Sequence, residues 1–211
     1  MAATSYQSLL PYVLVEASGC PSFTAITAIN YAARELCLIS SCWQDAQDLP
    51  LVSGQAVYTV ALPLASAVVR QIKSVSYDGV VLKAETSRSL NPALFAQAGA
   101  PTCYVINESM GVHLYPTPSV NEAGKLISVR ASYIPALEAE DMPAALMDRI
   151  AERLIFGAKA RVMMIHEKPF SNAVMAAHYI RQFDELVTKT RIEVELSYGS
   201  GSLSVTPVNF G

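Results

Sequence analysis

The chain has 211 residues, of which 52% are hydrophobic and 16% charged, and its formal net charge at pH 7 is −3. This composition supplies ample apolar material for a core and excludes an intrinsically disordered chain. A protein that neutralises many phosphates carries a basic excess, so the acidic balance argues against sequence-specific DNA reading but allows passive contact with DNA along a channel wall. Surplus apolar surface often becomes subunit contact, so we expect an oligomer.

The four cysteines form no CxxC pair, and Cys37 lies in a helical stripe where a free thiol packs as a small hydrophobe. The N-terminus lacks a positive segment followed by an apolar run. No apolar stretch reaches the roughly 18 residues that a membrane span needs. We therefore predict a cytosolic origin with reduced thiols, and no membrane partner.

Two helices are predicted in the first fifth of the chain. Residues 1–18 have one apolar side and end where Gly19 and Pro21 interrupt the pattern. Residues 22–43 form a clearer amphipathic helix with Ser22 as its candidate N-cap. Its apolar stripe is formed by Ile26, Ile29, Ala33, Leu36 and either Ile39 or Ser40.

Between residues 49 and 135 the apolar pattern changes from helical spacing to alternation, broken by Gly, Pro and Asn. Asp78-Gly79 tolerates the positive φ angles of a type I′ turn, which predicts a β-hairpin around it. A second hairpin is expected further on, and residues 92–97 are expected to form a short helical turn. The predicted strands are residues 57–60, 68–77, 80–82, 102–107, 112–115 and 126–133.

The last long stretch, residues 142–196, predicts two helices that pack as an αα-hairpin. Pro143 suits a first helical turn, and the first helix should end just before Pro169. Ser171 or Asn172 then offers an N-cap for the second helix. Gly157, in the middle of the first helix, costs about 1 kcal/mol relative to alanine, and close helix approach is the expected compensation.

This order of elements predicts an α+β fold: a helical bundle with a long αα-hairpin and an inserted antiparallel β domain, either a small sandwich or an open barrel. The expected domains are a discontinuous helical domain over residues 1–46 and 137–196 and a β domain over residues 47–136. Residues 197–211 are expected to form a flexible C-terminal tail that is more apolar than a solvated end requires.

No residue pattern typical of an enzyme or a metal site is present. His113, His166 and His178 have no HxH or HExxH spacing, and neither GxSxG nor a phosphate-binding glycine loop occurs. The acidic run of Glu138, Glu140 and Asp141 is expected to complement the dipole at a helix N-terminus.

The charged residues on the second long helix have two interpretations, and the sequence does not decide between them. Arg181, Glu185 and Lys189 are spaced at i,i+4. Such pairs form either a solvated face or a contact with a neighbouring subunit.

Several short motifs follow one another in a recognisable order. They are INYAAREL (29–36) with Trp43, GQAVY (54–58), VSYDG (75–79), PTCY (101–104), VHLYPTP (112–118), IFGAKA (155–160) and EKPF (167–170). In this order the chain resembles the head-to-tail adaptor (connector) proteins of tailed bacteriophages, particularly the short-tailed type.

The resemblance implies a structural protein without enzymatic activity or cofactor, assembled as a closed ring of about twelve copies under the portal. The ring would extend the DNA channel, contact genomic DNA passively and dock a tail or nozzle protein. The protein would assemble in the host cytoplasm and reside in the virion neck. The residues expected to contact the portal are Tyr198, Leu203, Val205, Val208 and Phe210, and those expected to contact the neighbouring subunit are Arg181, Glu185 and Lys189.

Two other classes of function stay open at this point. One is a cytosolic, hydrolase-like enzyme that uses His113 or His166 and would have a deep polar pocket around a histidine. The other is a nucleic-acid-binding accessory factor, which would have a basic patch.

Overall fold

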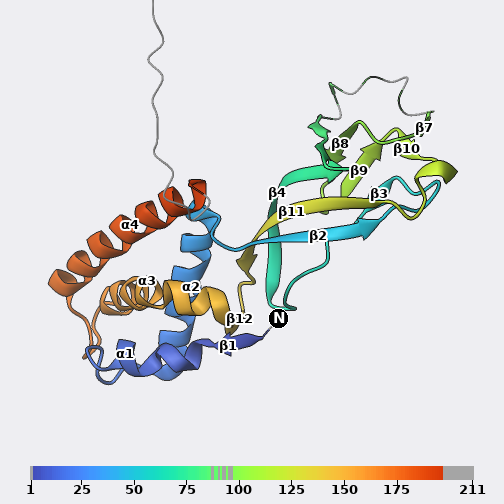
Figure 1. Cartoon of the computed structure of the whole chain (residues 1–211). Coiled ribbons are helices and arrows are strands. Elements are labelled where there is room, and N and C mark those ends of the chain that lie inside the picture. The colour runs from blue at the N-terminus through green and yellow to red at the C-terminus, as the bar shows by residue number, and fades with distance from the viewer. Residues whose placement is uncertain (1, 87, 90, 92–93, 95–96, 197–211) are drawn as a thin grey trace, which may run out of the picture.

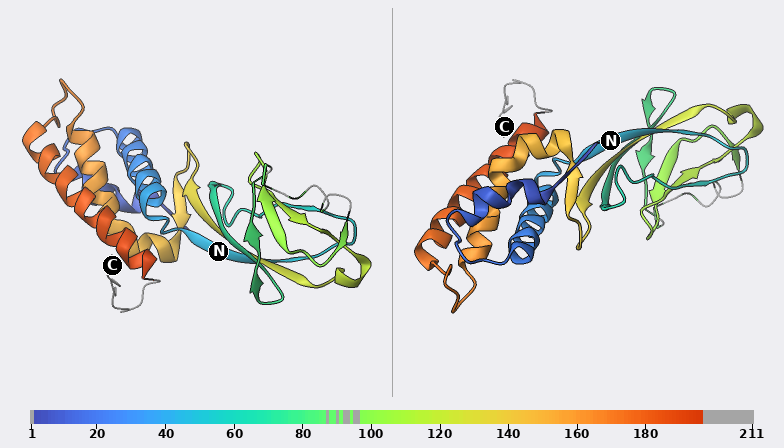
Figure 2. Two further views of the ribbon diagram at one scale, coloured as in Figure 1. Left: turned by 90° about the horizontal axis from the view of Figure 1, so that it is seen from above. Right: turned by 90° about the horizontal axis from the view of Figure 1, so that it is seen from below.

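The computed structural model describes residues 2–86, 88–89, 91, 94 and 97–196. The helices gather at one end of the molecule, and long strands lead away from them to the other end (Figure 1). The two views in Figure 2 show the same separation from above and below. The predicted α+β fold, helices with a β insertion between them in the chain, is confirmed.

The N-terminal segment is not the single helix predicted over residues 1–18. It contains strand β1 (Ala3–Ser5), a 3-10 helix (Tyr6–Leu9) and a five-residue helix, α1 (Leu10–Leu14). β1 pairs with a strand far along the chain, and this non-local pairing outweighs the local helical pattern.

Helix α2 (Ser22–Ser40) is confirmed, with different ends from those predicted. Pro21 occupies the N-cap position and Ser22 is the first helical residue. Ser41 adopts a left-handed conformation with φ of 52°, which ends the helix before Trp43.

Two four-stranded sheets form the β part. The first has the order β2-β11-β4-β5, from β2 (Gln44–Pro50), β11 (Leu126–Pro135), β4 (Ala67–Tyr77) and β5 (Val80–Val81). The second has the order β3-β9-β8-β6, from β3 (Val57–Tyr58), β9 (Val112–Tyr115), β8 (Cys103–Ile106) and β6 (Lys83–Ala84). β7 (Ala98–Gly99) and β10 (Thr117–Pro118) form a further short pair, followed by a 3-10 helix (Val120–Glu122).

The pairings are antiparallel except for β6 with β8 and β7 with β10, which are two residues long. Both predicted hairpins are present: β4 turns into β5 through Asp78 and Gly79, with φ of 49° and 77°, and β8 pairs with β9. Side chains of both sheets, such as Val75 and Leu114, belong to one buried cluster, as in a sandwich. Most of the helical turn predicted over residues 92–97 lies outside the described residues.

The chain re-enters the helical end through strand β12 (Asp141–Pro143), which pairs with β1. The acidic run, which we expected to complement the dipole at a helix N-terminus, precedes α3, and Asp141 is the first residue of β12. Asp141 instead accepts a hydrogen bond from the Ser66 hydroxyl. The next residue, Met142, is fully buried and pairs with Thr4 of β1, and this pairing holds the segment as extended chain.

Helices α3 (Ala144–Met163) and α4 (Ala173–Glu195) form the predicted αα-hairpin. α3 ends at Met163, earlier than the position before Pro169 that was predicted. Asn172 caps α4, and its side chain accepts a hydrogen bond from the Met175 N–H at 3.1 Å. None of the helices in the described residues combines the length and apolarity needed to cross a membrane.

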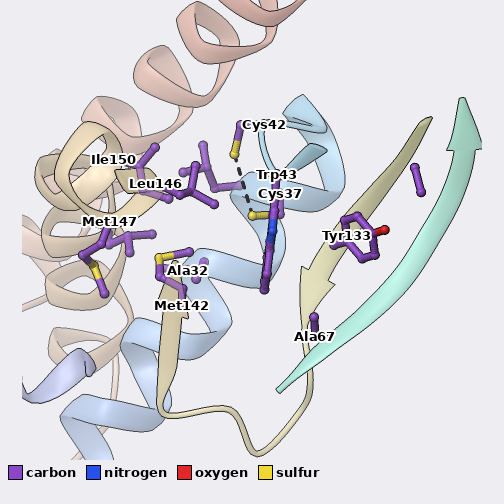
Figure 3. Close-up of a cluster of buried hydrophobic side chains, with 14 of the residues drawn as sticks. Ala32, Cys37, Cys42, Trp43, Ala67, Tyr133, Met142, Leu146, Met147 and Ile150 are labelled. Carbon is purple, nitrogen blue, oxygen red and sulfur yellow. Dashed lines mark hydrogen bonds between the residues drawn. The ribbon is translucent and has the colours of Figure 1, made fainter. Parts of the chain in front are cut away.

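The helical end and the first sheet meet in one buried cluster (Figure 3). The ring centroids of Trp43, which follows α2, and Tyr133, in β11, lie 6.0 Å apart. The Cys37 and Cys42 sulfur atoms are 3.7 Å apart at the end of α2. Asn30 of α2 adds polar anchors, because its side-chain amide donates to the carbonyls of Ala136 (3.1 Å) and Leu137 (2.6 Å).

Candidate interaction surface

Helix α2 is apolar on two sides, and one of them is exposed. Its inner side, including Ile29 and Leu36, is fully buried against the core. On the outer side Phe23 is 73% exposed and Tyr31, Leu38 and Ile39 are each close to half exposed. A helix that is apolar all round is normally covered on both sides, so the outer side has the character of a contact surface.

The outer side of α2 forms one wall of a groove with a volume of about 890 Å³. Ile134 at the end of β11 and Ile165 beyond α3 complete its apolar lining. This groove, which we call the α2 groove, therefore brings together three segments that are distant in the sequence.

Charged groups at the edge of the α2 groove are tied to the fold. Arg161 of α3 forms an ion pair with Glu35, donates to the Gly157 carbonyl at 2.7 Å and lies 5.2 Å from the Phe183 ring centroid. Burial lowers the pKa of the Arg161 guanidinium, and Glu35 opposes that shift. Arg34 donates to the Pro135 carbonyl.

Polar side chains in the lining of the α2 groove are engaged within the fold: the Thr27 hydroxyl donates to the Phe23 carbonyl at 2.9 Å, and the Glu35 carboxylate pairs with Arg161. The apolar walls and charged edge of the groove are suited to holding a protein surface. The geometry thus favours an interaction site over a catalytic one.

The comparison with protein families is consistent with this character. The family model described as SU10 adaptor protein matches residues 4–205. The chain belongs to the SU10 adaptor protein family. This is a family of bacteriophage structural adaptors rather than enzymes, and the resemblance to phage head-to-tail adaptors is thereby supported. No curated protein matches the sequence.

The three histidines of the adaptor do not converge on one site. His113, in β9, stacks on Tyr115 with ring centroids 4.3 Å apart, and burial lowers its pKa. His166 is exposed between α3 and α4, and His178 meets the Tyr179 ring edge-on at 5.4 Å. Across the described residues, no group of three or more His, Cys, Asp or Glu side chains is placed to hold a metal ion.

The residues predicted to contact a neighbouring subunit form one face of the adaptor. Arg181, Glu185 and Lys189 are exposed on α4, whereas Phe183 and Val187 of the same helix are buried. The predicted portal-contact residues lie outside the described residues; they are Tyr198, Leu203, Val205, Val208 and Phe210.

The sequence did not predict the α2 groove. Residues on both apolar sides of α2 recur at helical spacing, so the pattern does not distinguish the buried side from the exposed one. The available signal was the width of that pattern: Phe23, Tyr31 and Leu38 recur at near-helical spacing outside the predicted stripe.

Proposed function

We propose that this adaptor is a neck protein of a short-tailed phage, forming a ring of about twelve copies that joins the portal to the tail. The ring extends the DNA channel and contacts the genome passively. The observation that carries the proposal is the family match over residues 4–205, which spans nearly the whole chain.

The surface chemistry supports assembly. A ring needs two different contact faces on each copy, because its interfaces are heterologous. The α2 groove supplies an apolar face, and the exposed Arg181, Glu185 and Lys189 on α4 supply a charged one. In this arrangement both faces contact neighbouring copies.

The remaining partners follow from the same arrangement. The portal binds residues 198–210, and the face away from the portal docks a tail or nozzle protein. A net charge of −3 favours sliding of DNA over tight binding. The adaptor assembles in the host cytoplasm and becomes part of the virion. Residues 1–46 with 137–196, and residues 47–136, act as its two structural domains.

Negative-stain imaging of the adaptor alone and mixed with its portal tests the proposal. We expect rings capping the portal in the mixture. Absence of any association under conditions in which the virion is stable would contradict it. A variant that lacks residues 198–211 should keep its folded core and lose portal docking. Docking that is unchanged in this variant would remove the tail from the proposal.

A further inference from the structure

Four cations surround a hollow where α2 ends against the first sheet. They are Arg70 and Lys73 of β4, Arg130 of β11 and Arg191 of α4. The hollow has a volume of about 790 Å³ and also has apolar walls. Those walls are formed by Val194 and by Leu38 and Ile39, which the hollow shares with the adjoining end of the α2 groove. We call this surface the basic hollow.

Two β-bulges bring the first two cations together. Along β11, Arg130 pairs with Ser74 and the next residue with Ile72, so Lys73 is an extra residue in β4. The pairing shifts again one step further on and leaves Arg70 as a second extra residue. Bulges re-aim side chains that a regular strand would point to opposite faces.

As a result, both side chains reach the same atom. Lys73 Nζ lies 3.1 Å and Arg70 Nη1 3.5 Å from Ser41 Oγ, at the end of α2. Burial lowers the pKa of the Lys73 ammonium, and the neighbouring Arg70 lowers it further. Two like charges are therefore held together on a neutral hydroxyl.

The protein itself supplies little neutralising charge here. Glu195 is the one carboxylate in the lining, and it pairs with Arg191 at 2.8 Å. Within the described residues, Arg70, Lys73 and Arg130 have no carboxylate within 4.0 Å. The Arg70 Nε atom is buried without a hydrogen-bond partner. Part of this charge complements the C-terminal end of the α2 dipole, but that end carries only about half a charge.

We propose that the basic hollow binds a carboxylate-bearing segment of a partner protein, with its acidic side chain on Arg70, Lys73 and Arg130. Arg70 and Lys73 converge on one hydroxyl, whereas a DNA backbone needs cations spread along a track of phosphates. The apolar walls receive the apolar neighbours of the acidic residue. Charge and wall chemistry together therefore favour an acidic, partly apolar peptide.

Fluorescence anisotropy with the full chain tests this proposal. The probes are a labelled short peptide of alternating glutamate and leucine, the same peptide with glutamine in place of glutamate, and a labelled DNA duplex. We expect the wild-type chain to bind the glutamate peptide in preference to both other probes, with an affinity that falls as salt is added. The double substitution Arg70→Gln with Lys73→Gln should weaken binding at least about tenfold.

Two further variants make the test specific. Arg88→Gln with Lys168→Gln removes the same charge from exposed positions outside the hollow and should bind as the wild type does. Arg130→Gln changes an exposed side chain, so it should fold even if the double variant does not, and it should weaken binding, while Arg130→Lys restores it.

Three outcomes would overturn the proposal: no binding of the glutamate peptide by the wild-type chain, equal loss in the control variant, or DNA binding that depends on Arg70 and Lys73 in place of peptide binding. None of these readouts depends on the portal, so the proposal can fail while the neck function stands.

Discussion

At the scale of single residues, Gly157 shows how tightly the helices approach one another. A Cβ atom at this position would lie 2.8 Å from the Ala32 Cβ and 2.8 Å from the Phe183 ring. Side chains from α2 and α4 thus occupy the space in which a larger residue of α3 would sit. The close helix approach predicted from the sequence is confirmed.

We predict that Gly157→Ala destabilises the protein despite the better helix propensity of alanine. Contacts of 2.8 Å require neighbouring atoms to shift, so we expect an overpacking cost of about 2–3 kcal/mol. The propensity gain recovers about 1 kcal/mol, so the free energy of unfolding should fall by about 1–2 kcal/mol. Urea denaturation measures this. Gly99→Ala is the control, because an added Cβ there meets nothing within 4 Å. Unchanged or increased stability of Gly157→Ala would contradict the prediction.

A second residue-scale feature is the buried ammonium of Lys159. Its side chain is 8% exposed and pairs with Glu16 at 2.7 Å. Tyr179 also donates to Glu16, and burial followed by this carboxylate raises the pKa of Tyr179 to about 12. The bonds from Lys159 and Tyr179 lower the pKa of Glu16. This cluster fastens the segment after α1 to α3 and α4.

The cluster predicts an acid-sensitive contribution to stability. A carboxyl group whose pKa is lowered by folding stabilises the native state above its unfolded pKa, and that contribution is lost as the pH falls through the folded pKa. At neutral pH the urea midpoint of the wild type should therefore be higher than that of Glu16→Gln. Below about pH 4 the two urea midpoints should become equal. Glu152→Gln, at an exposed position of α3, should show no such convergence. A difference between wild type and Glu16→Gln that stays constant with pH would refute this account.

At the scale of elements, the start of α4 depends on one side chain. Four N–H groups at a helix N-terminus lack partners within the helix. The side-chain oxygen of Asn172 satisfies that of Met175, and the sequence offered Ser171 as an equal alternative. The structure distinguishes them because Asn172, with extended φ and ψ of −152° and 94°, occupies the N-cap position.

We predict that Asn172→Ala lowers the free energy of unfolding by about 1 kcal/mol, the usual cost of losing an N-cap. Ser171→Ala should change it by much less, since Ser171 lies outside the cap. Thermal or urea unfolding of the two variants compares the positions directly. An equal loss in both would show that the cap is shared.

At the scale of the whole molecule, the α2 groove is apolar surface that a single chain leaves uncovered. Phe23, Tyr31 and Leu38 are exposed without contributing to the buried core. Substitutions at these positions should spare the fold of the subunit and act on assembly. The proposed ring gives this surface a neighbouring copy as its occupant.

We predict that Phe23→Gln combined with Leu38→Gln reduces ring formation on the portal at least about tenfold, as expected for loss of large apolar contacts at an interface centre. Unfolding of the free subunit should remain close to wild type. Val80→Gln with Val174→Gln, which changes two exposed apolar residues elsewhere, is the matched control. Normal rings in the groove variant would place the subunit contact on another face.

The sequence by itself determined the elements whose signals are local. Asp78-Gly79 supplies the positive φ angles of its turn, and helical periodicity with a cap at Ser171 or Asn172 defines the α3–α4 hairpin. Tertiary structure alone decided the elements that depend on distant partners. β2, with the sequence QDAQDLP, has too few apolar residues to be predicted as a strand and is ordered by pairing with β11.

The candidate sites also divide into those that the sequence predicts and those that only the tertiary structure shows. Periodicity placed Arg181, Glu185 and Lys189 on one helix face, because their spacing matches the helical repeat. The basic hollow arises only when the register of β11 leaves Arg70 and Lys73 as extra residues that face Ser41. Register is a property of two strands together, so no pattern within β4 alone reveals it. Likewise, only the folded chain shows that one apolar side of α2 is buried while the other remains open.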